Sequence, residues 1–478
     1  MSTQHQRALG ALLAAAALGS SGCVSEPSET GRPIGPGPDV VLISIDTLRA
    51  DRMSLYGHTR DTTPGLTRMA EEAIVFDRAY HNGGGTLPSH MTMMTSLHPR
   101  AHWVTPSTGR TLPPERTTLA EVFHRHGWDT AAFVDGGWMA PKFGFAQGFD
   151  IYEDAGGGGF EKVLPAASNW LADREERPAF LFLHTYDVHS QTDRLPYECP
   201  DGGHWRYLEE GFTPVGFDGC RDGRCASELL SQLDAQLAAK TLDPADALGP
   251  TEIEWMKALY DGCIRWADDQ LGEFFEHLQD LGIYDRALIV VTSDHGEEFL
   301  DHGRLLHHQN GFEEIARVPL IVKLPFGGGG GRRVGELAAL VDLMPTLLEY
   351  ARLPIPEVAQ GTSLRPAIES SVAVRSDLHV FSVLRGPRYK YFADTGDVYD
   401  LTKDTTETEA VADLDADLRT HLQERLWGLV NRDIALQEAL DQGLEPPRTE
   451  LTPEERQELE ALGYLVTEEP EPPQQQPE

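Results

Sequence analysis

The stretch Asn82–Arg100, NGGGTLPSHMTMMTSLHPR, places a threonine hydroxyl where a reactive group would serve. Three glycines, Gly83–Gly85, let the backbone bend and approach a ligand closely. Pro88 suits a first helical position, and Ser89–Leu97 is predicted to form the helix. Free N–H groups at such a helix start attract anions. Thr86 is therefore a candidate nucleophile, although Thr-x-Pro is also an ordinary N-terminal capping sequence.

Two apolar runs of strand length end in polar residues. Asp39–Ile45 (DVVLISI) leads directly into Asp46, and Ala287–Thr292 (ALIVVT) leads through Ser293 into Asp294 and His295. Open α/β sheets keep their active sites at the carboxyl ends of their strands. We therefore expect these side chains to meet, although Asp294-His295 could also cap a helix that follows the strand.

Asp46, Asp294 and His295, with the Oγ of Thr86, form an oxygen and nitrogen donor set suited to one divalent metal ion, Ca, Mn, Mg or Zn. Such an ion would lower the pKa of the Thr86 hydroxyl. It would also offset charge on the oxygens of a sulfate or phosphate ester. The set therefore predicts a metal-assisted reaction on an anionic ester.

Further segments in the same order make the chain resemble the sulfatase family of the alkaline phosphatase superfamily. The matching segments are ISIDTLRADRMSLYGHTRDTTPGLTRMAEEAIVFDRAY, TLPSH, FLFLHTYDVH, DDQLGEFFEHLQDLGIYD, SDHGEEF, RVPLIVKLP, VDLMPTLLEYARLP with QGTSL, and KYF with DVYDLTKDTTE. Together they cover most of residues 39–411. The resemblance implies an α/β fold and hydrolysis of sulfate or phosphate esters.

The resemblance also suggests roles for five histidines, because matching family residues approach the substrate oxygens or protonate the leaving group. His184 and His189 follow a buried strand, and His302, His307 and His308 follow the metal pair. His189 and His308 are the preferred catalytic pair, and His184 and His302 are expected to bind substrate. Each could instead lie in a solvated loop. That alternative is strongest for His307, because adjacent residues rarely both face one site.

The net charge of −36, from 76 acidic and 40 basic residues, argues against nucleic acid as a partner and against unaided docking on an anionic membrane. An anionic sulfate or phosphate ester would have to be attracted by the metal and by nearby basic residues. Arg49 and Lys390 are candidates for contact with the anion, although surface ion pairs would explain them equally well.

The chain departs from the best-known sulfatases at the nucleophile. Their Cys or Ser, converted to formylglycine within Cys/Ser-x-Pro-x-Arg, is replaced by Thr86, and their Arg by His90. Thr47 replaces the second Asp of the usual pair, and His295 replaces Asn. Threonine cannot become formylglycine, so none is expected. Threonine with Asp-His is instead similar to lipoteichoic acid synthases and nucleotide phosphodiesterases of the superfamily.

The expected function is therefore metal-dependent hydrolysis of sulfate or phosphate esters with Thr86 as the nucleophile. One alternative is a phosphodiesterase, or a transferase of the phosphoglycerol or phosphoethanolamine type. Another is a catalytically silent binding protein on a sulfatase scaffold. Retention of the whole metal set weighs against the silent scaffold.

Alternating strands and helices predict an α/β fold, with a mostly parallel sheet sandwiched by helices over residues 39–375. Residues 376–466 are expected to form a smaller antiparallel sheet with a packed helix. Strands are predicted at 39–45, 130–134, 179–184, 287–292, 318–323, 378–384, 389–393 and 398–401. Helices are predicted near 64–73, 89–97, 117–126, 163–173, 252–281 and 413–430, with a Thr452/Glu455 capping box before a last helical segment.

The N-terminal region indicates export. Residues 1–23 resemble a lipoprotein-type signal peptide that leaves Cys23 lipidated, with a plain secretory signal as the alternative. Residues 24–38 are expected to be a flexible tether, and 467–478 a disordered tail. The predicted location is the periplasm or cell surface of a bacterium, with membrane contact only through the lipid at Cys23.

An exported chain can form disulfides, and here a bond of Cys220 with Cys225, or of Cys199 with one of them, is expected. Cys263 falls in a helical pattern and is predicted to be a buried, small apolar side chain. The glycine run Gly156–Gly159 lacks the Gly-Lys-Ser/Thr ending of a nucleotide-phosphate loop, and a flexible surface turn is expected there.

Overall fold

The computed structural model describes residues 37–462, apart from 175–176, 192–193, 210–211, 213, 215–216, 218–223, 309 and 445–446. The predicted signal peptide (1–23), most of the tether (24–38) and the predicted tail (467–478) lie outside the described residues. Within the described part, no helix combines the length and the apolar character that a membrane span requires.

The centre of the protein is an eight-stranded sheet with the order β10-β2-β9-β6-β1-β5-β3-β4. Its strands are β1 (Val40–Ile45), β2 (Ile74–Tyr80), β3 (Asp129–Val134), β4 (Ile151–Asp154), β5 (Ala179–Thr185), β6 (Leu288–Thr292), β9 (Arg317–Lys323) and β10 (Arg332–Ala339). In this sheet β9 runs antiparallel to both of its neighbours, and the other pairs are parallel. The predicted mostly parallel sheet is confirmed.

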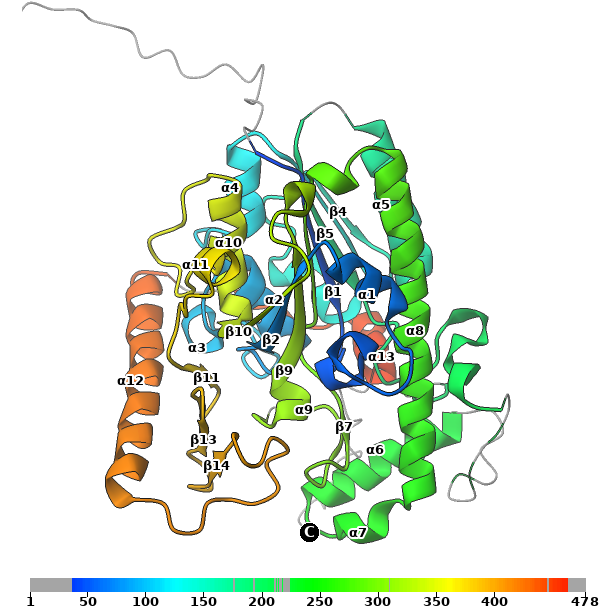
Figure 1. Cartoon of the computed structure of the whole chain (residues 1–478), viewed down its shortest axis with the longest axis vertical. Coiled ribbons are helices and arrows are strands. Elements are labelled where there is room, and N and C mark those ends of the chain that lie inside the picture. Colours follow the sequence, from blue (N-terminus) through cyan, green and yellow to red (C-terminus); the bar gives the residue numbers. More distant parts are fainter. Residues whose placement is uncertain are drawn as a thin grey trace, which may run out of the picture.

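Helices cover both faces of this sheet (Figure 1). The helices are α1 (Pro64–Ala70), α2 (Thr86–Thr95), α3 (Pro99–His102), α4 (Leu119–Arg125), α5 (Gly159–Asp173), α6 (Arg224–Ala238), α7 (Pro244–Ala247), α8 (Pro250–Asp280), α9 (Glu313–Ala316), α10 (Leu343–Tyr350) and α11 (Arg365–Ser370). A short hairpin, β7 (Glu298–Phe299) with β8 (Leu305–Leu306), follows β6.

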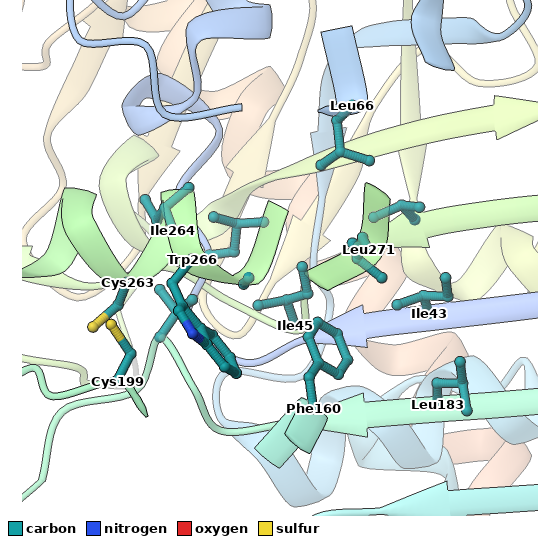
Figure 2. Packing of buried hydrophobic residues seen from close by; sticks show 14 of the residues in the cluster. Ile43, Ile45, Leu66, Phe160, Leu183, Cys199, Cys263, Ile264, Trp266 and Leu271 are labelled. Carbon is teal, nitrogen blue, oxygen red and sulfur yellow. The ribbon is translucent and has the colours of Figure 1, made fainter. Parts of the chain in front are cut away.

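Side chains of β1 alternate between two apolar cores. Ile43 and Ile45 pack with α1, α5 and α8, as Figure 2 shows for Leu66, Phe160 and Leu271. Val40 and Leu42 pack on the opposite face with residues of α2, α4 and α10. A strand buried on both faces is mostly apolar. In β1 the one polar side chain, Ser44, lies near the carboxyl end with its Oγ 2.9 Å from His90 Nε2, and Asp46 follows at the carboxyl edge of the sheet.

The C-terminal region forms a separate four-stranded antiparallel sheet, as predicted. It contains β11 (Leu378–Val380), β12 (Val383–Arg385), β13 (Tyr389–Phe392) and β14 (Val398–Asp400), and α12 (Ala416–Leu440) packs beside it (Figure 1). The single strand predicted over 378–384 is a hairpin, because Phe381 adopts a left-handed φ of 54° between β11 and β12.

The last helix, α13 (Pro453–Ala461), begins with the predicted capping box. The Thr452 N–H donates to Glu455 Oε2 at 2.7 Å, and the Glu455 N–H donates to Thr452 Oγ1 at 3.2 Å. Leu459 is buried in the core that contains α2 and α4, so α13 packs on the large sheet's side of the molecule.

The cysteines differ in part from expectation. Cys199 and Cys263 are free and buried, with their side chains close together in Figure 2, so the alternative disulfide through Cys199 is wrong. Burial of Cys263 is confirmed. Cys225 is disulfide-bonded. Cys220 lies outside the described residues.

The surface turn predicted for Gly156–Gly159 is wrong at its last residue. Gly159 is buried and begins α5, and its N–H donates to Asp135 Oδ1 at 2.9 Å. A Cβ on Gly159 would lie 1.9 Å from Asp187 Oδ1. Glycine is therefore required by a close packing contact at this position.

Candidate active site

Thr86 is the first residue of α2, which begins three residues earlier than predicted. Gly85 precedes it as the N-cap residue with φ of 117°, a conformation that favours glycine. Thr86 therefore does not cap the helix, and the capping interpretation of Thr-x-Pro is wrong. The ring of His90 lies one turn along α2, where its Nδ1 donates to the Thr86 carbonyl at 2.8 Å. This bond helps to fix the backbone that carries the Thr86 hydroxyl.

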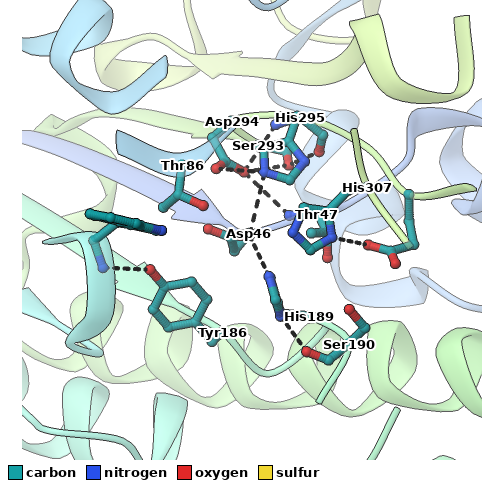
Figure 3. Close-up of polar contacts among 12 residues, drawn as sticks. Asp46, Thr47, Thr86, Tyr186, His189, Ser190, Ser293, Asp294, His295 and His307 are labelled. Carbon is teal, nitrogen blue, oxygen red and sulfur yellow. Dashed lines mark hydrogen bonds and ion pairs between the residues drawn. The ribbon is translucent and has the colours of Figure 1, made fainter. Parts of the chain in front are cut away.

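Asp46, Asp294 and His295 meet beside Thr86, as Figure 3 shows. They follow β1 and β6, which are adjacent in the sheet, and all three are buried. One ligand atom from each lies within 4.8 Å of the others. Among the described residues, Asp46 Oδ1, Asp294 Oδ2 and His295 Nε2 accept or donate no hydrogen bond. Buried polar atoms rarely remain without a partner, so this cluster fits a bound cation.

His295 already has the tautomer that a metal ligand requires. Its Nδ1 lies 2.9 Å from the carbonyl oxygen of Gly296, so Nδ1 must carry the proton. The lone pair of Nε2 then points toward the two carboxylates, at 3.4 Å from Asp294 Oδ2 and 3.9 Å from Asp46 Oδ1. A hydrogen bond on the far nitrogen is the usual way in which a metal-binding imidazole is oriented.

The two buried carboxyl groups oppose each other electrostatically. Burial and the neighbouring Asp294 raise the pKa of Asp46 well above its usual range, although a hydrogen bond from Thr86 acts in the other direction. Burial would also raise the pKa of Asp294, but His295, His90 and the bond with Asp46 outweigh it and lower that pKa. A divalent cation between them would stabilise both groups in the ionised form.

Two of the predicted histidines lie at the same cluster. His184 Nε2 is 3.3 Å from Asp46 Oδ2, and its buried position lowers its pKa well below the usual value. His189 Nε2 is 3.9 Å from Asp46 Oδ1, and its Nδ1 donates to the Ser190 carbonyl at 2.5 Å. Both imidazoles are therefore placed to act on a group bound beside Asp46.

The structure favours His307 over His308 as the third histidine. The ring centroid of His307 lies 4.6 Å from that of His189 and 5.0 Å from that of His295. His308 also lines the cavity, but its Nε2 is 2.9 Å from the Asp234 carboxylate. Because Asp234 engages His308 Nε2, we prefer His307 as the third histidine of the cluster, and the expected catalytic role of His308 stays a prediction.

Behind His307 lies a carboxylate that the sequence analysis did not single out. Glu297 is fully buried, with Oε2 at 3.2 Å from His307 Nδ1. Its Oε1 accepts a hydrogen bond from the Tyr197 hydroxyl at 2.9 Å. Glu297 stands two residues after His295 in the motif SDHGEEF, but nothing in the sequence indicates that Tyr197 and His307 reach it.

The other predicted substrate-binding residues, Arg49, His302 and Lys390, are held in ion pairs and do not line the cavity beside Thr86. Their partners are Asp51 and Asp301 for Arg49, Glu314 for His302, and Glu313 and Glu407 for Lys390. Of the two interpretations given for Arg49 and Lys390, the ion-pair role is the one that the contacts show. The Lys390 pairs lie in the protein interior, whereas buried Arg49 reaches partners near the surface, with the side chains of Asp51 and Asp301 50% and 25% exposed.

The cavity beside Thr86 has a volume of about 180 Å³. Its lining consists of Gly84, Gly85, Thr86, Leu87, Pro88, Pro106, Trp138, His295, His307 and His308. Pockets that enclose a drug-sized molecule measure roughly 300–1,000 Å³, so this one can enclose only the head of an ester. One wall, with Thr86, His295 and His307, is polar. The other wall, with Trp138 and Pro106, is apolar.

Comparison with known proteins shows which family and fold this chain resembles. Residues 38–353 match the model of the Sulfatase family. Arylsulfatase K of Bos taurus is 23% identical over 455 residues, which covers 82% of each chain. The structure of phosphonate monoester hydrolase of Agrobacterium radiobacter is similar with a TM-score of 0.66 at 22% identity, over 83% of this chain and 96% of that one. BT4656, solved in complex with its substrate D-glucosamine-2-N,6-O-disulfate, gives a TM-score of 0.64 at 19% identity, over 85% and 99%.

Proposed function

The chain belongs to the sulfatase family, and we propose that it is a metal-dependent hydrolase of sulfate or phosphate esters with Thr86 as the nucleophile. The observation that carries this proposal is the meeting of the Thr86 hydroxyl with three buried, unpartnered ligand atoms, at the base of a cavity sized for an ester head group. That statement about partners applies to the described residues.

Asp46, Asp294 and His295, with Thr86 Oγ, would hold one divalent cation. Bound there, the ion would lower the pKa of the Thr86 hydroxyl and offset charge on the ester oxygens. The comparisons do not identify the metal, and the donor set suits Ca, Mn, Mg or Zn.

Residues of the chain carry out the nucleophilic attack and the proton transfers. Thr86 Oγ attacks the sulfur or phosphorus atom, and its proton passes to the adjacent Asp46 carboxylate. His184 and His189 face the oxygens that do not leave. His307 donates a proton to the departing alcohol as that ester bond breaks. Water then attacks the threonine ester, with His307 taking one of its protons, and Asp46 returns its proton to Thr86 Oγ as that ester bond breaks.

A threonine nucleophile favours phosphorus over sulfur. A formylglycine hydrate has a second hydroxyl that helps to expel sulfate, whereas Thr86 supplies one oxygen only. Release must then come from attack by water on the threonine ester, which suits a phosphoryl group better. The fold shared with a phosphonate monoester hydrolase is compatible with this preference, and the likeness to arylsulfatase K keeps sulfate esters open. Replacement of that water by a second alcohol would give the transferase alternative.

The test is a substrate panel of aryl sulfate, phosphate monoester and phosphate diester with Thr86→Ala and Thr86→Ser. We expect the alanine variant to lose about 10³-fold or more in kcat/KM on every active substrate, and the serine variant to keep part of the rate. Activity should disappear after chelation and return with a divalent cation. Thr95→Ala, on the same helix, is the control and should stay near the wild-type rate.

Wild-type rates in Thr86→Ala would refute the nucleophile assignment. Turnover of sulfate esters alone would refute the preference for phosphorus while leaving the nucleophile in place. Folding of each variant is checked by its circular dichroism spectrum and melting temperature.

A further inference from the structure

A second cluster of potential metal ligands lies where the C-terminal region meets the end of the α2–α3 segment. His98 precedes α3, His379 is in β11 and Asp433 is in α12. Their exposed fractions are 7%, 4% and 2%. One ligand atom from each lies within 4.8 Å of the other two. Three separate segments therefore converge on one buried point with nitrogen and oxygen donors.

The contacts leave one donor of this cluster unused. His379 Nε2 lies 2.8 Å from Asp433 Oδ2, and Gln360 Nε2 donates to Asp433 Oδ1 at 2.8 Å. The His98 ring lies over the His379 ring, with centroids 4.5 Å apart. Within the part of the chain that the structure describes, the buried His98 Nδ1 has no hydrogen-bond partner. Leaving such an atom unsatisfied costs roughly 1–3 kcal/mol, so an occupant is expected.

We propose that His98, His379 and Asp433 bind a divalent transition-metal ion, of which Zn²⁺ is the best fit, at a site separate from that of Thr86. Two imidazole nitrogens with one carboxylate oxygen are donors that zinc prefers, whereas Mg²⁺ and Ca²⁺ prefer oxygen alone. Donor atoms on a tetrahedral zinc lie about 3.4 Å apart, since each bond is about 2.1 Å. Here the three ligand atoms lie within 4.8 Å of one another, and His379 Nε2 and Asp433 Oδ2 are closer, at 2.8 Å. Small side-chain rotations would bring the three atoms to the spacing of a zinc site.

The surroundings suit three protein ligands and one open position. A cavity of about 530 Å³ adjoins the cluster, so water or a small anion can reach the ion. Three arginines line that cavity. Arg375 is paired with Asp342 and Arg425 with Asp377, and Arg432 is exposed to solvent. The charge of Arg375 and Arg425 is therefore largely offset, and Asp433 remains as a negative ligand for the ion.

A metal here would tie the C-terminal region to the segment that carries Thr86. His98 lies three residues after the end of α2, and the carbonyl of His379 accepts a hydrogen bond from Asn82 Nδ2 at 3.4 Å. Asn82 leads into the glycine run before Thr86. One ion would thus brace both ends of that segment, whichever ester the enzyme cleaves.

The test is the zinc content of purified protein after zinc loading and removal of the excess, measured by elemental analysis. Asp433→Asn and His98→Gln should each hold one equivalent fewer than the wild type. His421→Gln, on the exposed side of α12, is the matched control and should keep the wild-type content. Because the result is a difference, it does not depend on whether the Thr86 site takes zinc.

A second measurement covers the case in which a variant folds poorly. In folded Asp294→Asn protein, whose first site is disabled, added Zn²⁺ should still raise the melting temperature, and Mg²⁺ should not. Co²⁺ in the same protein should give the visible absorption of a four-coordinate ion. Equal zinc content in the wild type and Asp433→Asn, or no response of Asp294→Asn to Zn²⁺ and Co²⁺, would overturn the proposal. The cluster would then be a hydrogen-bonded network only.

Discussion

Glu297 connects the reactive histidine to the interior of the protein. Its carboxylate is fully buried, and each of its oxygens has one partner, the Tyr197 hydroxyl and His307 Nδ1. A carboxylate on the far nitrogen of an imidazole fixes the orientation of the ring and stabilises its protonated form. Glu297 is therefore a positioning residue for the proton that His307 would give to the leaving group.

Glu297→Gln should lower kcat/KM by about 10- to 100-fold, because the amide keeps the shape and loses the charge. The loss should be greatest for esters with poorly acidic leaving alcohols, which need the proton most. Steady-state kinetics on a leaving-group series measures this effect.

Tyr197→Phe is the control for this substitution, because it removes the other hydrogen bond of Glu297 and leaves the charge. We expect a much smaller loss. A uniform loss across all leaving groups in Glu297→Gln would indicate a purely structural role.

At the residue scale the sequence indicated the four residues of the proposed metal site but not the arrangement around them. Asp46, Asp294 and His295 were identifiable because they lie at the carboxyl ends of the buried strands β1 and β6. The sequence could not show that His308 contacts Asp234 and His302 contacts Glu314, since these partners come from other parts of the fold. Local sequence shows which groups can react, and the tertiary structure determines what each of them contacts.

The buried carboxyl group of Asp187 accepts hydrogen bonds from the end of β5 and from the start of α5. Asp187 Oδ2 accepts the N–H of Phe160 at 2.8 Å, in the first turn of α5, and the Thr185 hydroxyl donates to the same atom. Burial raises the pKa of Asp187 to about 6, although these hydrogen bonds oppose the shift. The loop that carries His189 is thereby coupled to α5.

This carboxyl group gives the stability of the protein a specific pH dependence. The pKa of Asp187 is higher in the folded than in the unfolded protein, so binding of a proton to this carboxyl group stabilises the fold. That stabilisation is fully present below the unfolded pKa of 3.8 and is lost as the pH rises through about 6. Asp187→Asn keeps the acceptor oxygen and cannot ionise. Its free energy of unfolding relative to the wild type should therefore improve from pH 5 to pH 8, by about 1 kcal/mol. Denaturant unfolding at the two pH values measures this difference.

An Asp187→Asn variant whose relative stability stays constant, or worsens toward pH 8, would show that the carboxylate is stabilising when ionised. Asp173→Asn, at the exposed C-terminal end of α5, supplies the control for a general effect of removing charge from this helix.

At the scale of elements, the long periodic segments were predicted well and the marginal strands were not. The helix expected over 252–281 is α8, and the strands leading to the site are β1 and β6. The sequence analysis missed the strands β2, β4 and β10 and the β7–β8 hairpin. It also missed the helices α3, α6, α7, α9, α10 and α11. β4 is a short edge strand with Ile151 40% exposed, and β10 is the opposite edge. Edge strands lack the continuous apolar run that identifies a buried strand.

The C-terminal sheet packs against the glycine run Gly83–Gly85 that precedes Thr86. Phe381, from the β11–β12 turn, packs so closely on Gly84 that a Cβ there would lie 1.6 Å from the ring. The C-terminal sheet is thus positioned against the glycine run that precedes Thr86. This explains physically why consecutive glycines occur there, a need that the sequence alone attributed only to ligand approach.

We propose that lipid at Cys23 anchors the protein after export, because residues 1–23 resemble a lipoprotein-type signal peptide that ends at this cysteine. Wild-type protein should partition into detergent, and Cys23→Ser should move it to the aqueous phase or leave it unprocessed. Equal partitioning of both proteins in Triton X-114 would contradict the anchor.

The charge of the whole molecule should also govern how fast an anionic ester arrives. With 76 acidic and 40 basic residues, the long-range field repels anions. Arg49, the arginine nearest in sequence to Asp46, does not offset this locally, because its guanidinium is paired with Asp51 and Asp301. The anionic ester is then attracted only at short range, by the proposed metal site and its histidines. Added salt should screen the long-range repulsion of the ester and leave this short-range attraction largely intact.

We accordingly expect kcat/KM to rise as the ionic strength increases from about 10 mM to about 150 mM, where the screening length falls to roughly 8 Å. The rise should be larger for a dianionic phosphate monoester than for a singly charged diester, because the repulsion scales with substrate charge. Comparing the two slopes in one buffer, with potassium chloride as the added salt, removes effects on the enzyme itself. A fall in kcat/KM that is steeper for the dianion would mean that a local positive field outweighs the acidic surface.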